Sequence, residues 1–342
     1  LAANTTGTSN TAVGTSALFA NTIGDNNAAV GKSALAANTT GASNTAVGSS
    51  ALAVNTTGAS NVAVGTSALV ANTTASNNTA VGTSALAANT TGTSNTAVGT
   101  SALAANTTGA SNVAVGTNAL DANTTANGNV AVGDNALGVN TTGGNNTAVG
   151  TDALGANTTG IGNVAVGANA LQVHTTGIQN TCLGYLTGNT ITTGSNLTCL
   201  GYDAEPTSAT ATNEITLGNA SVATLRCQVT TITALSDERD KKEIQDIGLG
   251  LAFVQKLKPV KFKWAMRDGT EKPDLFEPGF IAQDFQRAQT EANAEWMGLV
   301  YESNPDRLEA SPGKLIPVLV KALQELSIQN TALEARLSLL EH

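Results

Sequence analysis

Aromatic residues, cysteine and charged side chains are scarce in this 342-residue sequence, and the scarcity is uneven. Eight of the eleven aromatic side chains lie after residue 235. Residues 1–235 carry only two basic and seven acidic side chains, whereas residues 236–342 carry 14 basic and 18 acidic ones. The chain is long enough for two domains, but its composition supports a conventional hydrophobic core only in the C-terminal part.

Other absences exclude further classes of function. Cys182, Cys199 and Cys227 are too few for a disulfide framework and lack metal-ligand spacing, so we expect neither a metal site nor a cofactor. The net charge of −9, without basic clusters, argues against nucleic-acid binding. No apolar run approaches the ~20 residues of a membrane span. Because the sequence starts at Leu1 with neither Met nor a signal peptide, we expect an N-terminal attachment segment to be missing.

A 17-residue repeat fills the first part of the chain. The pair Val13-Gly14 returns every 17 residues up to Val166-Gly167 and continues as leucine–glycine up to Leu217-Gly218. The thirteen copies follow one another without an insertion. Such fixed self-similarity is the signature of a solenoid, in which each coil buries its apolar side only against its neighbours.

The repeat unit is too short for a pair of helices and predicts β-strands. In residues 44–60 we expect two short strands, at 45–47 and 51–54, bounded by Gly and Asn corners. Ala, Val and Leu should point inward, and stacked Asn and Thr corners should form hydrogen-bonded ladders. A core this thin favours three chains around one axis. The Asn-x-Ala-Val-Gly pattern is similar to the head repeats of trimeric autotransporter adhesins, which implies a trimeric β-roll or an interleaved β-solenoid.

Three positions interrupt the regular pattern. Cys182 and Cys199 share one repeat position, so we expect them to stack as small buried residues, although the coil spacing also permits a disulfide. Tyr185 and Tyr202 share another position and predict an aromatic step near the end of the repeat. His174 stands alone, with no partner with which to do chemistry.

The pattern predicts three regions. Residues 1–204 form the repeat shaft, 205–235 the last coil and a β neck, and 236–342 a separate α+β domain. In that domain the apolar spacing predicts a helix at 247–257, a strand at 260–264 with Phe262 and Trp264 on one face, and a turn at Asp268-Gly269. Residues 280–285 and 296–301 should supply the rest of its core.

Residues 313–342 predict a coiled-coil helix. Seven residues spaced alternately by 4 and 3 form a heptad seam, here called the leucine seam: Leu319, Leu323, Leu326, Asn330, Leu333, Leu337 and Leu340. Asn330 falls at an a position, where a buried amide fixes register and strand number. A helix packed only on its own domain is the alternative, but the length of the seam favours oligomerisation.

The segment between the two parts carries the most specific motif, Ser236-Asp237-x-Arg239-x-Lys241. The string follows a fibrous repeat, and Lys258-Pro259, residues 279–284 and the closing helix continue the similarity. From residue 213 to residue 342 the chain resembles the C-terminal intramolecular chaperone domain of phage endosialidases, tail spikes and tail fibres.

The resemblance implies a serine–lysine dyad that cuts the chain once, in cis. Ser236 would be the nucleophile, Lys241 its base and Leu235–Ser236 the scissile bond, while Asp237 and Arg239 hold the geometry. Serine needs such a base, and lysine serves only if burial or a neighbouring cation keeps it neutral. On spacing alone, Lys242 is a second candidate for the base, and only the resemblance favours Lys241. In the other interpretation, residues 236–238 simply cap a helix, and the two roles can coexist.

The function expected from the whole sequence is a homotrimeric phage tail fibre. Its C-terminal domain would align three chains, and the resemblance implies three strands in the coiled coil. Further expected partners are a phage baseplate or other appendage, through the missing N-terminal segment, and a host surface receptor, glycan or protein. The alternatives are a bacterial trimeric surface adhesin and a polysaccharide-degrading tailspike. The tailspike is disfavoured because the shaft has few aromatics and no paired carboxylates.

Overall fold

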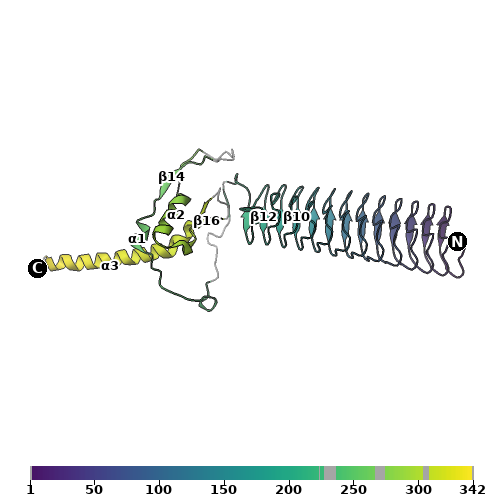
Figure 1. Ribbon diagram of the computed structural model, residues 1–342, viewed down its shortest axis with the longest axis horizontal. Coiled ribbons are helices and arrows are strands. Elements are labelled where there is room, and N and C mark those ends of the chain that lie inside the picture. Colours follow the sequence, from purple (N-terminus) through teal and green to yellow (C-terminus); the bar gives the residue numbers. More distant parts are fainter. Residues whose placement is uncertain (1, 223, 227–235, 266–273, 303–307, 341–342) are drawn as a thin grey trace. The chain divides into compact units, whose positions relative to one another are not determined.

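The computed structural model describes residues 2–222, 224–226, 236–265, 274–302 and 308–340. The chain divides into two compact units, Leu1–Asn219 and Ala220–His342. The first unit is a β-solenoid with one coil per 17-residue repeat, and the second is a small α+β region with a C-terminal helix (Figure 1). The predicted β-solenoid shaft, α+β region and long C-terminal helix are therefore confirmed.

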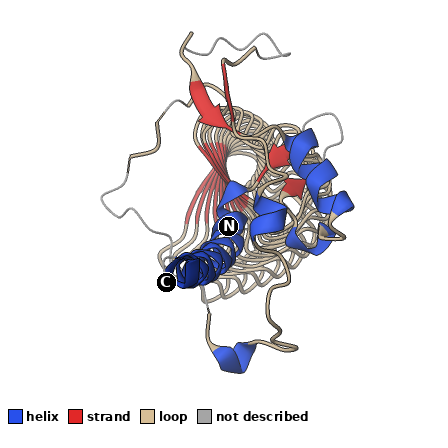
Figure 2. Cartoon of the chain, turned by 90° about the vertical axis from the view of Figure 1, so that its left-hand side faces the viewer, coloured by secondary structure: helices blue, strands red, loops and turns tan. Residues whose placement is uncertain are grey.

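Each coil contributes one three-residue strand to a single 13-stranded parallel sheet. Every strand pairs in register with the equivalent residues of the next coil, as in Thr45↔Val62. The strands lie one behind another along one side of the solenoid (Figure 2). They are β1 (Thr11–Val13), β2 (Ala28–Val30), β3 (Thr45–Val47), β4 (Val62–Val64), β5 (Thr79–Val81), β6 (Thr96–Val98), β7 (Val113–Val115), β8 (Val130–Val132), β9 (Thr147–Val149), β10 (Val164–Val166), β11 (Thr181–Leu183), β12 (Thr198–Leu200) and β13 (Ile215–Leu217).

The second strand predicted in each repeat is wrong. Residues 51–54 form a turn, in which Leu52 has a φ of 50°. The same leucine is left-handed in every coil from Leu18 to Leu171 and is fully buried. The left-handed conformation costs an L-residue about 1–2 kcal/mol, whereas burying a leucine side chain contributes about 1.5–3 kcal/mol. Burial therefore offsets the backbone strain and turns the chain inside each coil.

The interior of the solenoid is lined by alanine and leucine but not by valine, which corrects a second expectation. Ala46, the middle residue of its strand, is fully buried, whereas Val47 is 38% exposed. Successive strand residues point to opposite faces. Because alanine occupies the inward position, the first and third residues of every strand must face outward.

Glycine after each strand is required by the close stacking. Gly14 has a φ of +125°, and a Cβ placed on it would lie only 2.7 Å from the carbonyl oxygen of Gly31 in the next coil. The equivalent glycine has a positive φ in every coil up to Gly218. Only glycine accepts both this conformation and this approach of two backbones.

Two columns of buried asparagines run along the solenoid, as the ladder prediction required. In the first, Asn55 Nδ2 donates to Asn38 Oδ1 at 2.9 Å and to the Gly58 carbonyl at 2.9 Å. In the second, Asn44 Nδ2 donates to the Gly58 carbonyl at 2.8 Å, and its backbone N–H donates to Asn27 Oδ1 at 3.0 Å. Each coil thus satisfies its buried amides through its neighbour, which makes the stack specific as well as cohesive.

His174 replaces an asparagine of the first column and takes its place in the hydrogen-bonded ladder. Its Nδ1 lies 3.2 Å from Asn157 Oδ1, and its Nε2 lies 3.1 Å from Asn180 Nδ2. An imidazole with the proton on Nδ1 satisfies both contacts, because the amide nitrogen of Asn180 can only donate. Burial lowers the pKa of His174 to about 4, so the ring is neutral at pH 7.

The other two interruptions of the repeat are as predicted. Cys182 and Cys199 pair in register and are buried free thiols, and the hydrogen bond with Cys199, together with burial, raises the pKa of Cys182. Tyr185 and Tyr202 stack with ring centroids 5.9 Å apart. Cys227 and most of the predicted neck lie outside the described residues.

The second unit contains short elements around one small core. They are η1 (Glu238–Asp240), α1 (Leu251–Val254), β14 (Val260–Phe262), β15 (Glu277–Gly279), α2 (Ala282–Glu291), η2 (Glu295–Met297), β16 (Val300–Tyr301), β17 (Glu309–Ala310), η3 (Pro312–Leu315) and α3 (Ile316–Leu340). Two antiparallel pairs form, β14 with β15 and β16 with β17. Phe253, Phe285, Leu299 and Val318 are among the buried core residues.

Some predicted details of this unit differ. The helix expected at 247–257 is reduced to the four residues of α1, and Trp296, expected in the core, is 69% exposed. Phe262 and Trp264 contact each other edge to face, with centroids 5.1 Å apart. The turn predicted at Asp268-Gly269 lies outside the described residues.

The left-handed leucines predict an unusual sensitivity to side-chain branching. Leu86→Met keeps an unbranched Cβ and should cost less than about 1.5 kcal/mol. Leu86→Ile conserves volume but places a β-branched residue at a φ of 50°, so we expect it to cost roughly 2 kcal/mol more than the methionine variant. Thermal unfolding of the shaft followed by circular dichroism compares the two, and equal midpoints would contradict the interpretation.

His174 predicts an acid-sensitive coil. Its pKa is lower in the folded chain, about 4 against an ordinary 6.5, so the unfolded chain binds the proton more tightly. The resulting stability is complete above about pH 6.5, is lost as the pH falls toward 4, and amounts to about 3 kcal/mol. We expect His174→Asn, which restores the asparagine column, to lose less of its thermal midpoint between pH 7 and pH 4 than the unsubstituted protein does. An identical loss in both proteins would refute the assignment.

Candidate functional site

The motif that follows the shaft folds into a single turn. Asp237 is the N-cap of η1, and its carboxylate accepts a hydrogen bond from the Arg239 backbone N–H at 2.9 Å. The chain is extended at Asp237 and again at Lys241, with the turn between them. The capping interpretation is thus correct for Asp237, and capping leaves the hydroxyl of Ser236 available for another partner.

The turn brings together the two residues predicted as a dyad. Lys241 Nζ donates a hydrogen bond to Ser236 Oγ at 2.7 Å. This is within the distance at which a base can take the proton of a nucleophile. Of the two lysines that compete on spacing, Lys241 is the one that forms this bond.

Asp237 and Arg239 hold the turn closed. Arg239 Nη2 lies 2.6 Å from Asp237 Oδ2, and Arg239 Nε lies 3.0 Å from Oδ1. The hydrogen bonds with Arg239 lower the pKa of the Asp237 carboxyl below its usual range. Neither side chain bonds to Ser236 or Lys241 in these contacts, so the pair acts on the shape of the turn.

The turn is open to solvent in the single chain. All residues from 236 to 246 are exposed, and the side chain of Arg239 is 88% exposed. A lysine amine acts as a base only where burial or a nearby cation favours its neutral form. The single chain therefore provides the distance between Oγ and Nζ but not the dry surroundings. Leu235, whose carbonyl group belongs to the predicted scissile bond, lies outside the described residues.

A second candidate surface is the leucine seam on α3. Its leucines are between 41% and 86% exposed, and Asn330 is exposed in the same row. A neighbouring face of the helix holds it to the unit, because Val318 and Ala322 are buried there and Glu325 Oε2 accepts the Leu251 N–H at 2.7 Å. Sequence reasoning missed Glu325, which caps the start of α1. The last turns of α3 extend beyond the rest of this unit (Figure 1).

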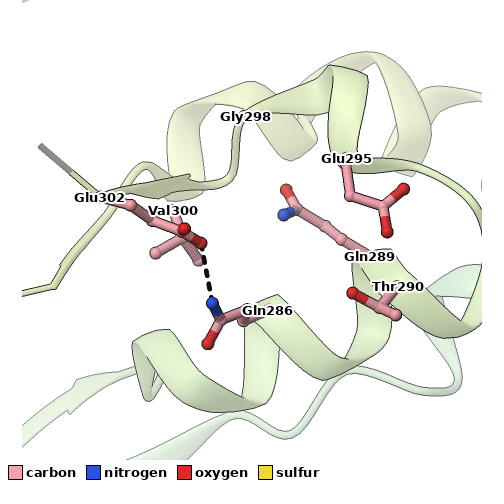
Figure 3. A pocket seen from close by; sticks show the side chains of 7 residues that line it. All are labelled: Gln286, Gln289, Thr290, Glu295, Gly298, Val300 and Glu302. Atoms are coloured by element: carbon pink, nitrogen blue, oxygen red, sulfur yellow. Dashed lines mark hydrogen bonds between the residues drawn. The ribbon is translucent and has the colours of Figure 1, made fainter. Parts of the chain in front are cut away.

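An open depression of about 480 Å³ lies between α2 and β16. Its lining is polar, and Gln286 Nε2 donates to Glu302 Oε1 at 2.9 Å across one side (Figure 3). The side chain of Gln289 is buried, and its Oε1 accepts a hydrogen bond from the Leu299 backbone N–H at 2.5 Å. These contacts give no reason to place a reaction in the depression.

The part of the chain that the structure describes contains neither a cluster of metal ligands nor a membrane-spanning helix. Within residues 2–222, 224–226, 236–265, 274–302 and 308–340, no three His, Cys, Asp or Glu side chains gather as metal ligands. Among the helices in these same ranges, none is long and apolar enough to cross a membrane.

Comparison with known proteins gives one match. The family described as chaperone of endosialidase matches residues 236–293, beginning at Ser236. No curated protein matches the chain, and no solved structure does. The matched segment contains the Ser236–Lys241 turn and follows, in the sequence, a β-solenoid of 17-residue coils.

Proposed function

We propose that this chain is one subunit of a homotrimeric phage tail fibre. In this proposal residues 236–342 act as one assembly domain that aligns three chains and then cuts itself from the shaft. The chaperone of endosialidase domain and the β-solenoid fit a phage tail fibre-type protein. Attachment to a baseplate through a preceding segment, and binding to a glycan or protein on the host surface, belong to the same proposal.

The observation that carries trimerisation is the exposed leucine seam. α3 is 25 residues long, and only its first turns pack on the rest of the unit. A heptad-spaced row of leucines exposed to water is energetically unfavourable. Coiled coils bury such a row between helices. Asn330 would sit inside such a bundle and penalise helices that associate out of register.

Self-association at this end answers a problem created by the shaft. Thirteen coils of nearly the same sequence can associate between chains in several registers, each shifted by whole coils and of similar energy. Pairing between distant or separate segments is also slow. A domain that trimerises first would align equivalent coils of the three chains, so that association of the shafts starts from a single register.

The proposed cleavage uses the Ser236–Lys241 pair. Ser236 Oγ attacks the carbonyl carbon of Leu235 while its proton passes to Lys241 Nζ. The Leu235–Ser236 C–N bond breaks, the released α-amine of Ser236 takes up the proton, and the Leu235 acyl group is held as an ester on Oγ. Water then hydrolyses the ester, which frees the hydroxyl and leaves a carboxylate on Leu235. Each chain reacts once.

The exposure of the turn suggests when the reaction occurs. Because the single chain leaves Lys241 in water, we propose that assembly covers the dyad and favours the neutral amine. Cleavage would then follow trimerisation, and removal of the assembly domain would leave a shaft that dissociates slowly because its route of assembly is gone.

Cleavage is tested by intact mass under denaturing conditions. We expect the unsubstituted protein to give two fragments that meet at Leu235/Ser236, and Ser236→Ala and Lys241→Ala to remain whole. Lys242→Ala is the matched control and should be cut as usual. Full-length mass in every protein would refute self-cleavage and leave the domain as a permanent cap.

Trimerisation is tested on α3 with two exposed, branched apolar residues, one in the leucine seam and one outside it. Leu333 lies in the seam and is 51% exposed, whereas Ile328 lies off the seam and is 70% exposed. We expect Leu333→Glu, in an uncleavable Ser236→Ala background, to abolish the native trimer mass, because three buried carboxylates would face one another. Ile328→Glu should remain a trimer. A monomeric mass for the unsubstituted protein, or loss of the trimer only with Ile328→Glu, would contradict the proposal.

A further inference from the structure

We infer that the outward face of the 13-stranded sheet is an interface with other copies of this chain, packed along the whole shaft. The contact is made by the valine column, defined as the third residue of each strand. Its members are Val13, Val30, Val47, Val64, Val81, Val98, Val115, Val132, Val149, Val166, Leu183, Leu200 and Leu217. This inference rests on the proposed self-association and adds which surface of the shaft takes part.

The valine column is apolar in every coil although the single chain leaves it in water. Val47, Val98 and Val132 are 38%, 37% and 36% exposed. The equivalent residue is never polar, because it is valine in ten coils and leucine in the last three. A repeating row of exposed branched side chains is a contiguous apolar patch, which soluble monomers rarely keep.

The fold of one coil does not explain this choice. The coil interior is already filled by the middle alanine and the buried leucine. At the first strand position, which faces the same side, threonine occurs in seven coils. Threonine and valine have similar strand preferences, so an exposed third position could accept threonine as the first does. Its exclusion from the third position points to burial of that position in the assembly.

The sheet face is also uncharged and large enough for a small interface. Thirteen strands at ~4.8 Å spacing and three residues at ~3.3 Å give roughly 600 Å² of sheet surface per chain, or about 1,200 Å² for two partners, which is the lower limit of a standard interface. No outward strand residue is charged, since the first and third positions hold only Thr, Ala, Val, Ile and Leu. The shaft's charged residues, such as Lys32, Asp121 and Asp134, all lie outside the strands.

The partner that fits is a second copy at the same height. A surface that repeats at every coil is met in register by another surface with the same repeat, so each layer would join the same valine from each chain. A different protein would need its own apolar column with an identical spacing. The leucine seam would set the height of the chains, and the valine column would continue the contact along the shaft.

The test uses two valines of one coil. Val47 belongs to the valine column and is 38% exposed, whereas Val54 lies outside the sheet and is 42% exposed. We prepare Val47→Cys and Val54→Cys in the full chain, treat each with a short bismaleimide, and examine the denatured products by electrophoresis. The unsubstituted protein gives the background from its native cysteines. We expect chains of Val47→Cys to be cross-linked and those of Val54→Cys to stay at background.

Each outcome has a defined meaning. A protein with trimer mass in which Val47→Cys stays at background, or in which only Val54→Cys is cross-linked, overturns the assignment of the face while leaving the trimer intact. A monomer mass refutes the proposed self-association itself. If Val47→Cys does not fold, the comparison is repeated further along the shaft. Val115→Cys then tests the valine column, and Val139→Cys is the control outside the sheet, where the valine is 45% exposed.

Discussion

The fold of the shaft depends on a constant coil length of 17 residues. The asparagine columns, the strand pairs and the glycine contacts each join a residue to its equivalent in the next coil. An insertion of one residue would leave buried amides without partners and would place a side chain where only glycine is accepted. The thirteen coils keep their length without exception because all three interactions require it.

In the proposed trimer, the same regularity would make assembly depend on the C-terminal unit. Interactions that are identical in every coil stabilise a stack strongly, but they do not distinguish one coil from its neighbours when chains associate. The second unit differs in kind, with its aromatic core, its charged surface and a helix whose seam contains Asn330. In the proposed assembly the helix would align the three chains, and the shaft, whose coils are nearly identical, would extend the contact. In the sequence, the Ser236–Lys241 turn lies between the shaft and this helix, within the second unit.

The repeat, the asparagine ladders and the long helix could be predicted because periodicity directly reflects stacking. The second strand could not, since an alanine–leucine pair does not reveal that Leu52 is left-handed. The valines were assigned to the interior because they are hydrophobic, whereas alternation from the buried Ala46 places Val47 outside. The Ser236–Lys241 contact followed from a motif, but its exposure to solvent did not. Trp296 was expected in the core because of its size, and no sequence signal marked it as exposed.

The central claim is that the C-terminal unit sets the register of the shaft, and refolding from denaturant tests it most directly. The full chain, uncleavable through Ser236→Ala, is compared with residues 1–235 alone by native mass spectrometry. The account predicts one discrete trimer from the full chain, and monomers or heterogeneous aggregates from residues 1–235. A discrete trimer formed as fast and as completely by residues 1–235 would contradict it.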